Sequence, residues 1–183
     1  QQSALEDGRW LDVPDSRTWT QPQPSPQLHM LWPETRLDAP PALPAPQGYV
    51  LRQYRDDDHD RYVTLMRKAG FADWPADRVA ALKQTVLPDG FFVLEHVATR
   101  AIVATAIATH KPTELHPYGG ELGWVAGDPA HKGKRLGAVV TAAATARLIR
   151  AGYRRIYLMT DDVRLPAIKT YLDLGYEPLL YCD

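Results

Sequence analysis

Residues 125–137 read VAGDPAHKGKRLG, and this stretch decides the fold expected for the chain. An apolar, strand-like run ends at Ala126, and a short basic loop then leads into a helix that begins near Leu136. The first N–H groups of a helix have no partner within the helix and together carry about half a positive charge. Gly133 and Gly137 let the backbone approach a ligand closely. The segment therefore predicts a binding site for a phosphate or pyrophosphate group.

The residues after this loop predict a parallel strand pair joined by a helix. A helix is expected over 136–151, and a strand follows over 155–160. A strand, a helix and a strand in this order favour a parallel pair with a crossover helix. A further helix is expected over 165–174, and then a last strand over 176–181 that Pro178 interrupts.

The residues before the loop predict strands and two helices. In chain order, the expected elements are a strand over 49–54, a helix from the capping residues Asp56–Asp58 to about residue 69, a second helix over 76–86, a turn over 88–90, an antiparallel hairpin of strands 91–97 and 101–109, and a strand over 121–126.

The N-terminal part of the chain is rich in proline. Nine of the 16 prolines lie before Gly48, where they break up regular structure. Residues 1–48 are therefore expected to form an arm, with one strand at Leu28–Trp32 that adds to a sheet edge. Residues 49–183 are expected to form the main domain.

Composition excludes several classes of function. The chain of 183 residues suits one domain, and its formal charge of −1 includes no basic run of the kind that binds nucleic acid. Apolar runs such as Ala101–Ala108 are far below the roughly 20 residues that span a membrane. Cys182 stands alone, and no His, Asp or Glu set has metal-ligand spacing. We therefore expect a cytoplasmic protein without a metal.

The loop at Pro129–Gly137, followed by an alanine-rich helix, resembles the acyl-CoA-binding motif of the GNAT superfamily. That motif reads Arg/Gln-x-x-Gly-x-Gly/Ala. Lys132 stands in the Arg/Gln place and Gly137 matches, but Arg135 replaces the middle glycine. The Arg135 side chain either crowds the diphosphate or adds a charge contact, so cofactor affinity is the property in question. The alternative interpretation is that the loop binds no cofactor and is a solvated basic turn that caps a core helix.

A second segment, RLPAIKTYLDLGY at residues 164–176, resembles the family pattern Asn-x-x-Ala-x-x-x-Tyr-x-x-x-Gly-Phe, with Arg164 in place of the Asn. The two motifs cover 121–176, and the elements over 49–110 follow the order of the family. The resemblance implies an α/β (α+β) fold in which a mixed sheet has antiparallel N-terminal strands and then a parallel strand-helix-strand pair, with helices on both faces.

The resemblance also implies acetyl-CoA as the co-substrate. The family's loop amides hold the pyrophosphate, and free amides of the preceding strand hold the pantetheine arm and the oxyanion. The residues that this assigns to cofactor binding are Trp124, Val125, Ala126, Lys132, Gly133, Lys134, Arg135, Leu136, Gly137 and Ala138.

Attack by an amine with a pKa near 10 requires a base. In some family members this base is a Glu on the strand before the loop, which corresponds to Glu121; the alternative is a carboxylate that meets solvent or pairs with an Arg. His110 and His116 are the fallback bases. Tyr171 matches the family's usual proton donor to the thiolate. Its alternative role is to pack its ring on the sheet with the hydroxyl exposed.

Five more residues are candidates for the acceptor side. Asp161 and Asp162 either draw a cationic amine or cap the following helix. Tyr54, Phe71 and Trp74 form either an aromatic wall or part of the core.

The predicted function is transfer of an acetyl or other acyl group to a primary amine of a small molecule or peptide. One alternative is a non-catalytic acyl-CoA-binding or regulatory module of the same fold. Another is an interaction module in which the proline-rich arm binds a partner. The sequence specifies neither the acceptor, the acyl length nor the oligomeric state.

Overall fold

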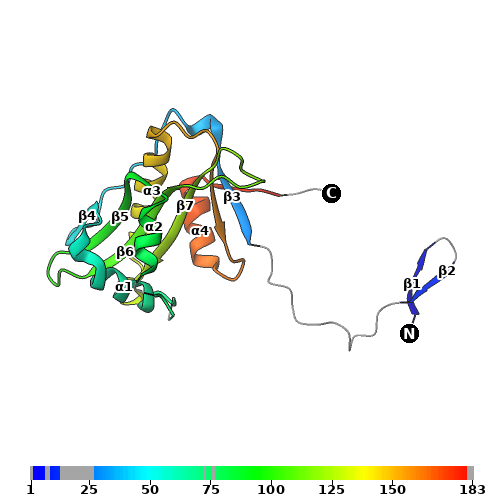
Figure 1. The fold of residues 1–183 in the computed structure, drawn as a ribbon, viewed down its shortest axis with the longest axis horizontal. Helices are drawn as coiled ribbons and strands as arrows, with labels where there is room; N and C mark the ends of the chain where they lie inside the picture. The colour runs from blue at the N-terminus through cyan, green and yellow to red at the C-terminus, as the bar shows by residue number, and fades with distance from the viewer. Residues whose placement is uncertain (1, 7–8, 13–26, 72, 76, 181–183) are drawn as a thin grey trace.

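The computed structural model describes residues 2–6, 9–12, 27–71, 73–75 and 77–180, and its main feature is a seven-stranded sheet (Figure 1). The order in the sheet is β4-β5-β6-β7-β8-β3-β9. Strands β7 and β8 run parallel, and the other neighbours run antiparallel. The strands are β3 (Leu28–Trp32), β4 (Tyr49–Gln53), β5 (Val86–His96), β6 (Ile102–His110), β7 (Gly120–Gly127), β8 (Ile156–Thr160) and β9 (Glu177–Pro178).

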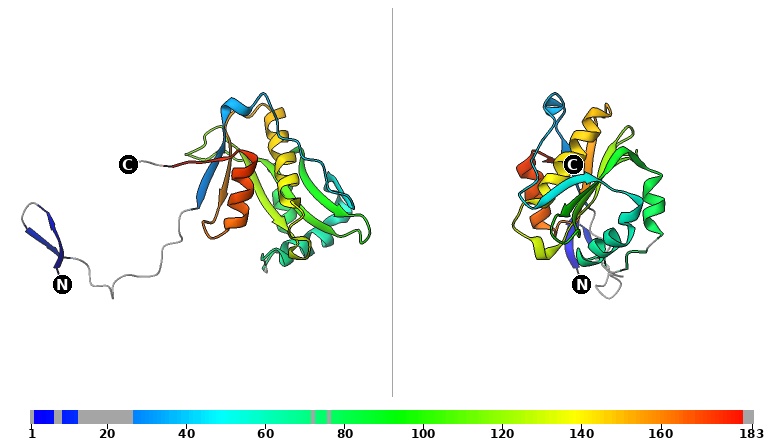
Figure 2. Two further views of the ribbon diagram at one scale, coloured as in Figure 1. Left: turned by 180° about the vertical axis from the view of Figure 1, so that it is seen from behind. Right: turned by 90° about the vertical axis from the view of Figure 1, so that its left-hand side faces the viewer.

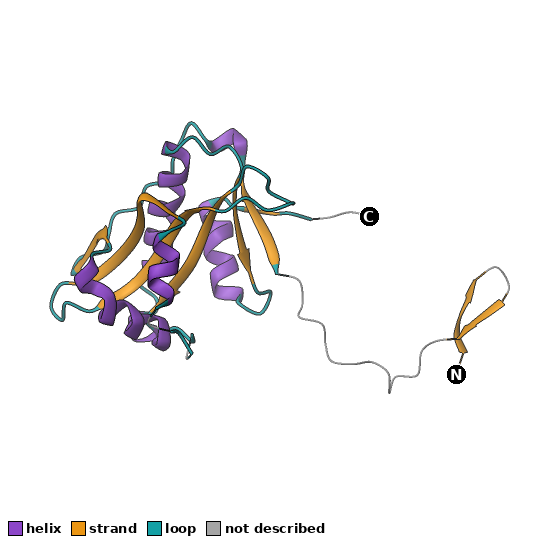
Figure 3. Cartoon of the chain, in the orientation of Figure 1, coloured by secondary structure: helices purple, strands orange, loops and turns teal. Residues whose placement is uncertain are grey.

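Helices cover both faces of this sheet. The helices α1 and α2 lie on one face and α3 and α4 on the other, as Figure 2 shows with the sheet nearly edge-on. Figure 3 shows the same layers coloured by secondary structure. The arrangement confirms the predicted mixed α/β fold. The helices are α1 (His59–Lys68), α2 (Arg78–Lys83), α3 (Leu136–Arg150) and α4 (Leu165–Leu174), and the 3₁₀ turns are η2 (Glu34–Arg36), η3 (Asp56–Asp58) and η4 (Pro129–His131).

Helix α3 packs closely on the sheet, as its sequence predicts. Leu136, Val140, Ala144 and Leu148 form one apolar stripe, and each is at most 5% exposed. They belong to the same core cluster as the inner residues of β6 and β8. Small alanine side chains bring the helix axis near the strands. This packing fixes the start of α3, and therefore the basic loop before it, against the sheet.

An aromatic cluster fills the space between α1 and the face of the sheet that α3 does not cover. Tyr62 is fully buried and meets the ring of Phe91 edge-on at 5.1 Å. Tyr54 stacks on Phe91 with ring centroids 4.3 Å apart. Of the two roles considered for Tyr54, an aromatic wall or part of the core, the structure shows the second.

Strand β3 belongs to the sheet, as predicted, but it does not form the outer edge. It pairs antiparallel with β8 from Leu28↔Thr160 to Trp32↔Ile156, and the two-residue β9 pairs with its other side. Met30 is fully buried, and Trp32 meets Tyr176 edge-on at 5.3 Å. These apolar contacts attach β3 to the core.

Two predictions of secondary structure are wrong. The N-terminal arm contains two strands besides β3, β1 (Gln2–Glu6) and β2 (Arg9–Asp12), which pair antiparallel. The first proline is Pro14, so the proline argument does not reach them. The expected turn at 88–90 lies inside β5, where the register shifts between Val86 and Phe91. A bulge takes the extra residues, and the strand continues.

Two expected elements are shorter than predicted. Helix α2 has six residues, and β9 ends at Pro178, which lacks the N–H that a longer ladder needs. The predicted end of the last strand, at residue 181, lies outside the described residues. No helix in the described part of the chain has the length and apolar character needed to span a membrane.

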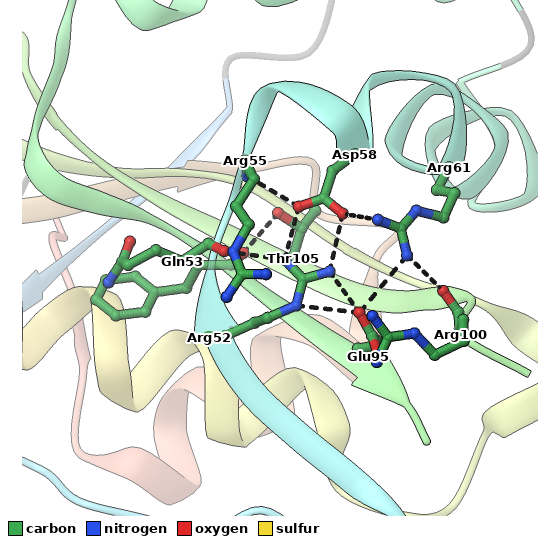
Figure 4. Close-up of polar contacts among 9 residues, drawn as sticks. Arg52, Gln53, Arg55, Asp58, Arg61, Glu95, Arg100 and Thr105 are labelled. Carbon is green, nitrogen blue, oxygen red and sulfur yellow. Dashed lines mark hydrogen bonds and ion pairs between the residues drawn. The ribbon is translucent and has the colours of Figure 1, made fainter. Parts of the chain in front are cut away.

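A buried ion cluster fastens the start of α1 to β4 and β5 (Figure 4). Asp58 is fully buried and Glu95 is 4% exposed. Arg52 donates to both carboxylates, Arg61 donates to Asp58, and Arg100 pairs with Glu95 at 2.7 Å. Burial by itself raises the pKa of Asp58, but its hydrogen bonds and the nearby arginines outweigh burial and lower it.

Candidate functional site

A cleft opens in the sheet where β7 and β8 separate. Their register pairs are Gly120↔Ile156 and Glu121↔Tyr157, and β7 has no further partner on β8 beyond Glu121. On its other side, β7 shifts register against β6. Trp124, in the shifted part, has a left-handed φ of 51°. The bulge and the separation leave a cleft of about 290 Å³.

The cleft contains both predicted catalytic residues. Glu121 and Tyr171 contribute to its lining, together with Trp124 and Val125 from the predicted cofactor set. Glu121 comes from β7 and Tyr171 from α4, fifty positions later in the chain. Ala126, also predicted to bind cofactor, has a buried side chain in the aromatic core, so only its backbone is available to a ligand.

Glu121 is held by two neighbours. One carboxylate oxygen accepts a hydrogen bond from Lys111 Nζ at 2.9 Å, and the other lies 3.4 Å from Thr109 Oγ1. Glu121 is 7% exposed, while the Lys111 side chain is 48% exposed. The carboxylate is therefore oriented by a lysine rather than by the arginine considered from sequence, and it still lines the cleft.

Tyr171 is 5% exposed and packs against Tyr176, with ring centroids 6.2 Å apart. Burial raises the pKa of Tyr171 to about 12, although the positive charge of Arg164 acts in the opposite direction. Its phenol is therefore protonated at neutral pH and is able to donate a proton. The Tyr171 ring is packed in the core, and Tyr171 also lines the cleft.

The basic loop between β7 and α3 is ordered by local contacts. Asp128 accepts a hydrogen bond from the backbone N–H of Ala130 at 3.0 Å and from Lys68 Nζ at 2.8 Å. Gly133 has a φ of 85°. A Cβ at Gly133 or Gly137 would meet no heavy atom within 4 Å, so both positions leave space for a ligand.

Arg135 has a left-handed conformation, with φ 57° and ψ 22°, directly before α3 begins. Glycine takes this conformation without strain, whereas a residue with a Cβ loses roughly 1 kcal/mol or more. The position thus keeps the backbone conformation typical of glycine while carrying an arginine. The side chain of Arg135 is exposed, as are those of Lys132 and Lys134.

The last residues of the predicted cofactor segment, 136–138, have little side-chain surface available to a ligand. The side chains of Leu136 and Ala138 are buried in the core. Gly137 and Ala138 lie in the first turn of α3, where backbone N–H groups have no partner within the helix. A cofactor would therefore meet these residues through their backbone.

Lys134 ties the loop to β4. Its Nζ donates to the Tyr49 hydroxyl oxygen at 2.7 Å, and that hydroxyl lies 2.8 Å from His131 Nδ1. A lysine only donates, so the Tyr49 proton points at His131, whose Nδ1 accepts. Burial lowers the pKa of His131. Tyr49 was not found from sequence, because it lies 85 residues from Lys134 and no local pattern relates them.

The two fallback bases lie outside the cleft lining. His116 is fully buried, and burial lowers its pKa to about 4. Its Nδ1 accepts from Arg155 Nε at 3.1 Å, and its Nε2 lies 3.0 Å from His29 Nδ1. His110 is exposed, with its Nδ1 2.7 Å from the Tyr153 hydroxyl.

The expected capping role of Asp161 and Asp162 is wrong. Helix α4 begins at Leu165, its N-cap position is Arg164, and no side chain caps it. Asp161 and Asp162 lie three and two positions before Arg164, so neither occupies the capping position. Asp161 instead accepts from Gln27 Nε2 at 2.9 Å and lines the cleft.

The three aromatic residues considered for the acceptor side, Tyr54, Phe71 and Trp74, have different locations in the structure. Phe71 lines the cleft, and its ring lies 5.9 Å from that of Trp124. Trp74 is 2% exposed and supports Trp124 from behind at 4.8 Å. With Tyr54 in the core, Phe71 and Trp124 are the aromatic pair at the cleft.

The cleft also contains residues that were not assigned to it from sequence. Gln27, Lys111 and Arg164 line it. Arg164 had been noted as a departure from the family motif, whereas nothing local marked the other two. Among the described residues, no group of three or more His, Cys, Asp or Glu side chains is placed to hold a metal ion.

Comparison with known proteins gives one family match. A family model described as "Acetyltransferase (GNAT) family" matches residues 50–176. The chain is 29% identical over 160 residues to a mycothiol acetyltransferase of Nocardia farcinica, covering 81% of this chain and 52% of that protein. It is 30% identical over 160 residues to one of Nocardioides sp., covering 74% and 52%. The chain thus spans about half the length of these relatives.

Solved structures share the fold. A GCN5-related N-acetyltransferase from Sphaerobacter thermophilus aligns with a TM-score of 0.65 at 18% identity, covering 86% of this chain and 50% of that one. The ribosomal-protein-S18-alanine N-acetyltransferase from Escherichia coli aligns with a TM-score of 0.57 at 17% identity, covering 72% and 79%. At such identities the likeness shows the fold alone.

Proposed function

The chain belongs to the acetyltransferase (GNAT) family, and from this premise we propose that it transfers an acetyl group from acetyl-CoA to a primary amine by direct attack. The observation that carries the proposal is that Glu121 and Tyr171 line one cleft, although they come from different elements. In the proposal, Glu121 is the general base and Tyr171 the general acid. The acceptor is a small-molecule or peptide amine.

The loop and the strand before it suit acetyl-CoA. Gly133 and Gly137 leave room for a pyrophosphate at the start of α3, where free N–H groups and the helix dipole favour negative charge. Lys132 and Arg135 add exposed cationic side chains. Trp124 and Val125 line the cleft. In the proposal, backbone N–H groups of residues 124–126 hold the pantetheine arm and polarise the thioester carbonyl.

The two proposed catalytic residues have complementary chemistry. An ammonium with a pKa near 10 must lose a proton before it attacks, and the Glu121 carboxylate accepts that proton. Tyr171, with a pKa of about 12, keeps its proton at neutral pH and donates it to the departing thiolate. Lys111 orients the Glu121 carboxylate through its 2.9 Å contact.

The proposed organisation keeps residues 1–48 as an N-terminal arm and 49–183 as the acetyltransferase domain. Strand β3 of the arm pairs with β8, and Gln27 before it lines the cleft, so the arm supports the cleft from that side. We propose a cytoplasmic enzyme whose partners are acetyl-CoA and the amine.

Calorimetric titration with acetyl-CoA tests the cofactor assignment. We expect micromolar-range binding that is lost in Gly137→Pro, because proline removes a backbone N–H from the first turn of α3, where a helix tolerates it. Gly137→Ala is the matched control that keeps the N–H. Absence of binding at millimolar acetyl-CoA would contradict the proposal. Binding without transfer to any amine would favour a non-catalytic module.

A further inference from the structure

Arg164 occupies a position in the cleft that the proposed reaction does not use. It is the last residue before α4, and it is half-buried. Its guanidinium carbon lies 5.7 Å from the ring centroid of Phe71, which belongs to the other side of the sheet. An arginine stacked on an aromatic ring is held in place while its N–H groups remain available at the edge of the guanidinium plane.

The charges in the cleft are only partly neutralised. Lys111 is paired with Glu121. Arg164 also lines the cleft. The ion pairs of the described residues do not include Arg164. Asp161, three positions earlier, accepts from the neutral amide of Gln27 rather than from a cation. The cleft thus presents one guanidinium and one carboxylate that do not neutralise each other.

From this arrangement we propose that the acceptor is a small amino acid-type molecule, with a carboxylate a few bonds from the reacting amine. Arg164 binds the carboxylate through its planar fork of donors, and Asp161 attracts the ammonium before Glu121 deprotonates it. This inference rests on the proposed acetyltransferase function. The amine and the carboxylate must lie close together, because Asp161 and Arg164 share one short loop.

Two observations favour this class over other anions. A phosphate group carries nearly two negative charges and is bound by clusters of cations, but Lys111, the second cation of the cleft, already pairs with Glu121. The cleft measures about 290 Å³ and must also receive the acetyl end of the cofactor. That volume suits a small acceptor.

Acetyl transfer to matched acceptor pairs tests the inference. The probes are L-alanine with L-alaninamide, and β-alanine with β-alaninamide, because each amide keeps the size of the acid and removes its charge. We would measure kcat/KM for each member with the wild type and Arg164→Gln. Dividing the acid-to-amide ratio of one protein by that of the other cancels the difference in amine basicity.

Arg78→Gln is the matched control. The guanidinium of Arg78 also lies over aromatic rings, 5.1 Å from the Trp74 centroid, but Arg78 does not line the cleft. We expect the acid-to-amide ratio to fall about tenfold or more in Arg164→Gln for at least one acceptor pair, as for the loss of a charge-assisted hydrogen bond. The ratio should stay within about twofold of wild type in Arg78→Gln.

Each other outcome overturns the inference in a distinguishable way. If both members of a pair lose rate equally, Arg164 acts on the chemistry near Tyr171 and not on the acceptor. If acetyl-CoA binds tenfold more weakly to Arg164→Gln and the ratio is unchanged, Arg164 belongs to the cofactor site. Wild-type protein that binds acetyl-CoA but acetylates none of the four probes overturns the acceptor class alone. Failure to bind acetyl-CoA overturns the proposed function, and the acceptor inference with it.

Discussion

The ion cluster beneath α1 and the cleft between β7 and β8 both contain cationic and carboxylate side chains, but they differ in how completely these charges are paired. In the cluster, Asp58 and Glu95 each contact more than one arginine (Figure 4). In the cleft, Arg164 and Asp161 have no opposite charge among their described contacts. A cluster in which every carboxylate is paired with an arginine stabilises the fold. Unpaired charged groups on a concave surface remain available to a ligand.

The largest effect is expected when the closed cluster is broken. Asp58→Ala removes a fully buried carboxylate and leaves Arg52 and Arg61 without their partner. We expect a loss of about 3–5 kcal/mol in the free energy of unfolding, measured by urea denaturation. Asp56→Ala is the control, because its carboxylate is 93% exposed and should contribute less than about 1 kcal/mol. Equal losses in the two variants would contradict the distinction between cluster and surface.

Replacing the proposed base should affect the cleft without affecting the fold. Glu121→Gln keeps the shape and removes the basic carboxylate. We expect kcat to fall by about 10²-fold or more, with the acetyl-CoA Kd little changed. Steady-state kinetics and calorimetry measure the two quantities. A variant with wild-type kcat would remove Glu121 from the mechanism and leave it as a partner of Lys111.

The pH dependence of stability should reveal the buried neutral imidazole beside β8. Burial lowers the pKa of His116 from 6.5 to about 4, so the unfolded chain binds more protons than the folded one between these values. Stability therefore falls as the pH drops from about 6.5 to about 4. In His116→Gln, urea unfolding measured across this range should show a shallower decline. An unchanged slope would assign the pH dependence to other groups.

The smallest effect is expected at Arg135, in neither the cluster nor the cleft. Arg135→Gly relieves the left-handed strain at φ 57°, and we expect a gain of less than about 1 kcal/mol because glycine also gives the unfolded chain more freedom. Acetyl-CoA should bind about threefold more weakly, since one exposed cation near a helix terminus is lost. Tighter binding would instead mean that the arginine crowds the diphosphate.

Much of the fold could be predicted from local sequence. The stripe of α3, the hairpin β5–β6 and the parallel pair β7–β8 follow from periodicity and element order, and the structure has all three. The bulge in β5 was misread because proline and glycine next to an aspartate are typical of a turn. Whether such residues turn the chain or bulge it depends on the partner strand.

For the candidate site, Glu121 and Tyr171 were predicted from sequence motifs, and both line the cleft, but their contacts were not predicted. Lys111 pairs with Glu121 across a loop, and Tyr49 meets Lys134 from a strand 85 residues away. Capping of α4 was one of two roles considered for Asp161, yet the N-cap position is Arg164 and the Asp161 side chain accepts from Gln27. Each of these contacts depends on the register of the sheet.

The sequence by itself therefore determined the order of the main helices and strands from β3 onward, the basic loop before α3 and the family to which the chain belongs. These depend on spacings of a few residues, where backbone geometry leaves few choices. Only the tertiary structure decided which charges neutralise one another and which face the cleft. Pairing between residues such as Arg52 and Glu95, 43 positions apart, is set by strand register and packing. The sequence around one such residue does not show which distant residue register and packing will bring next to it.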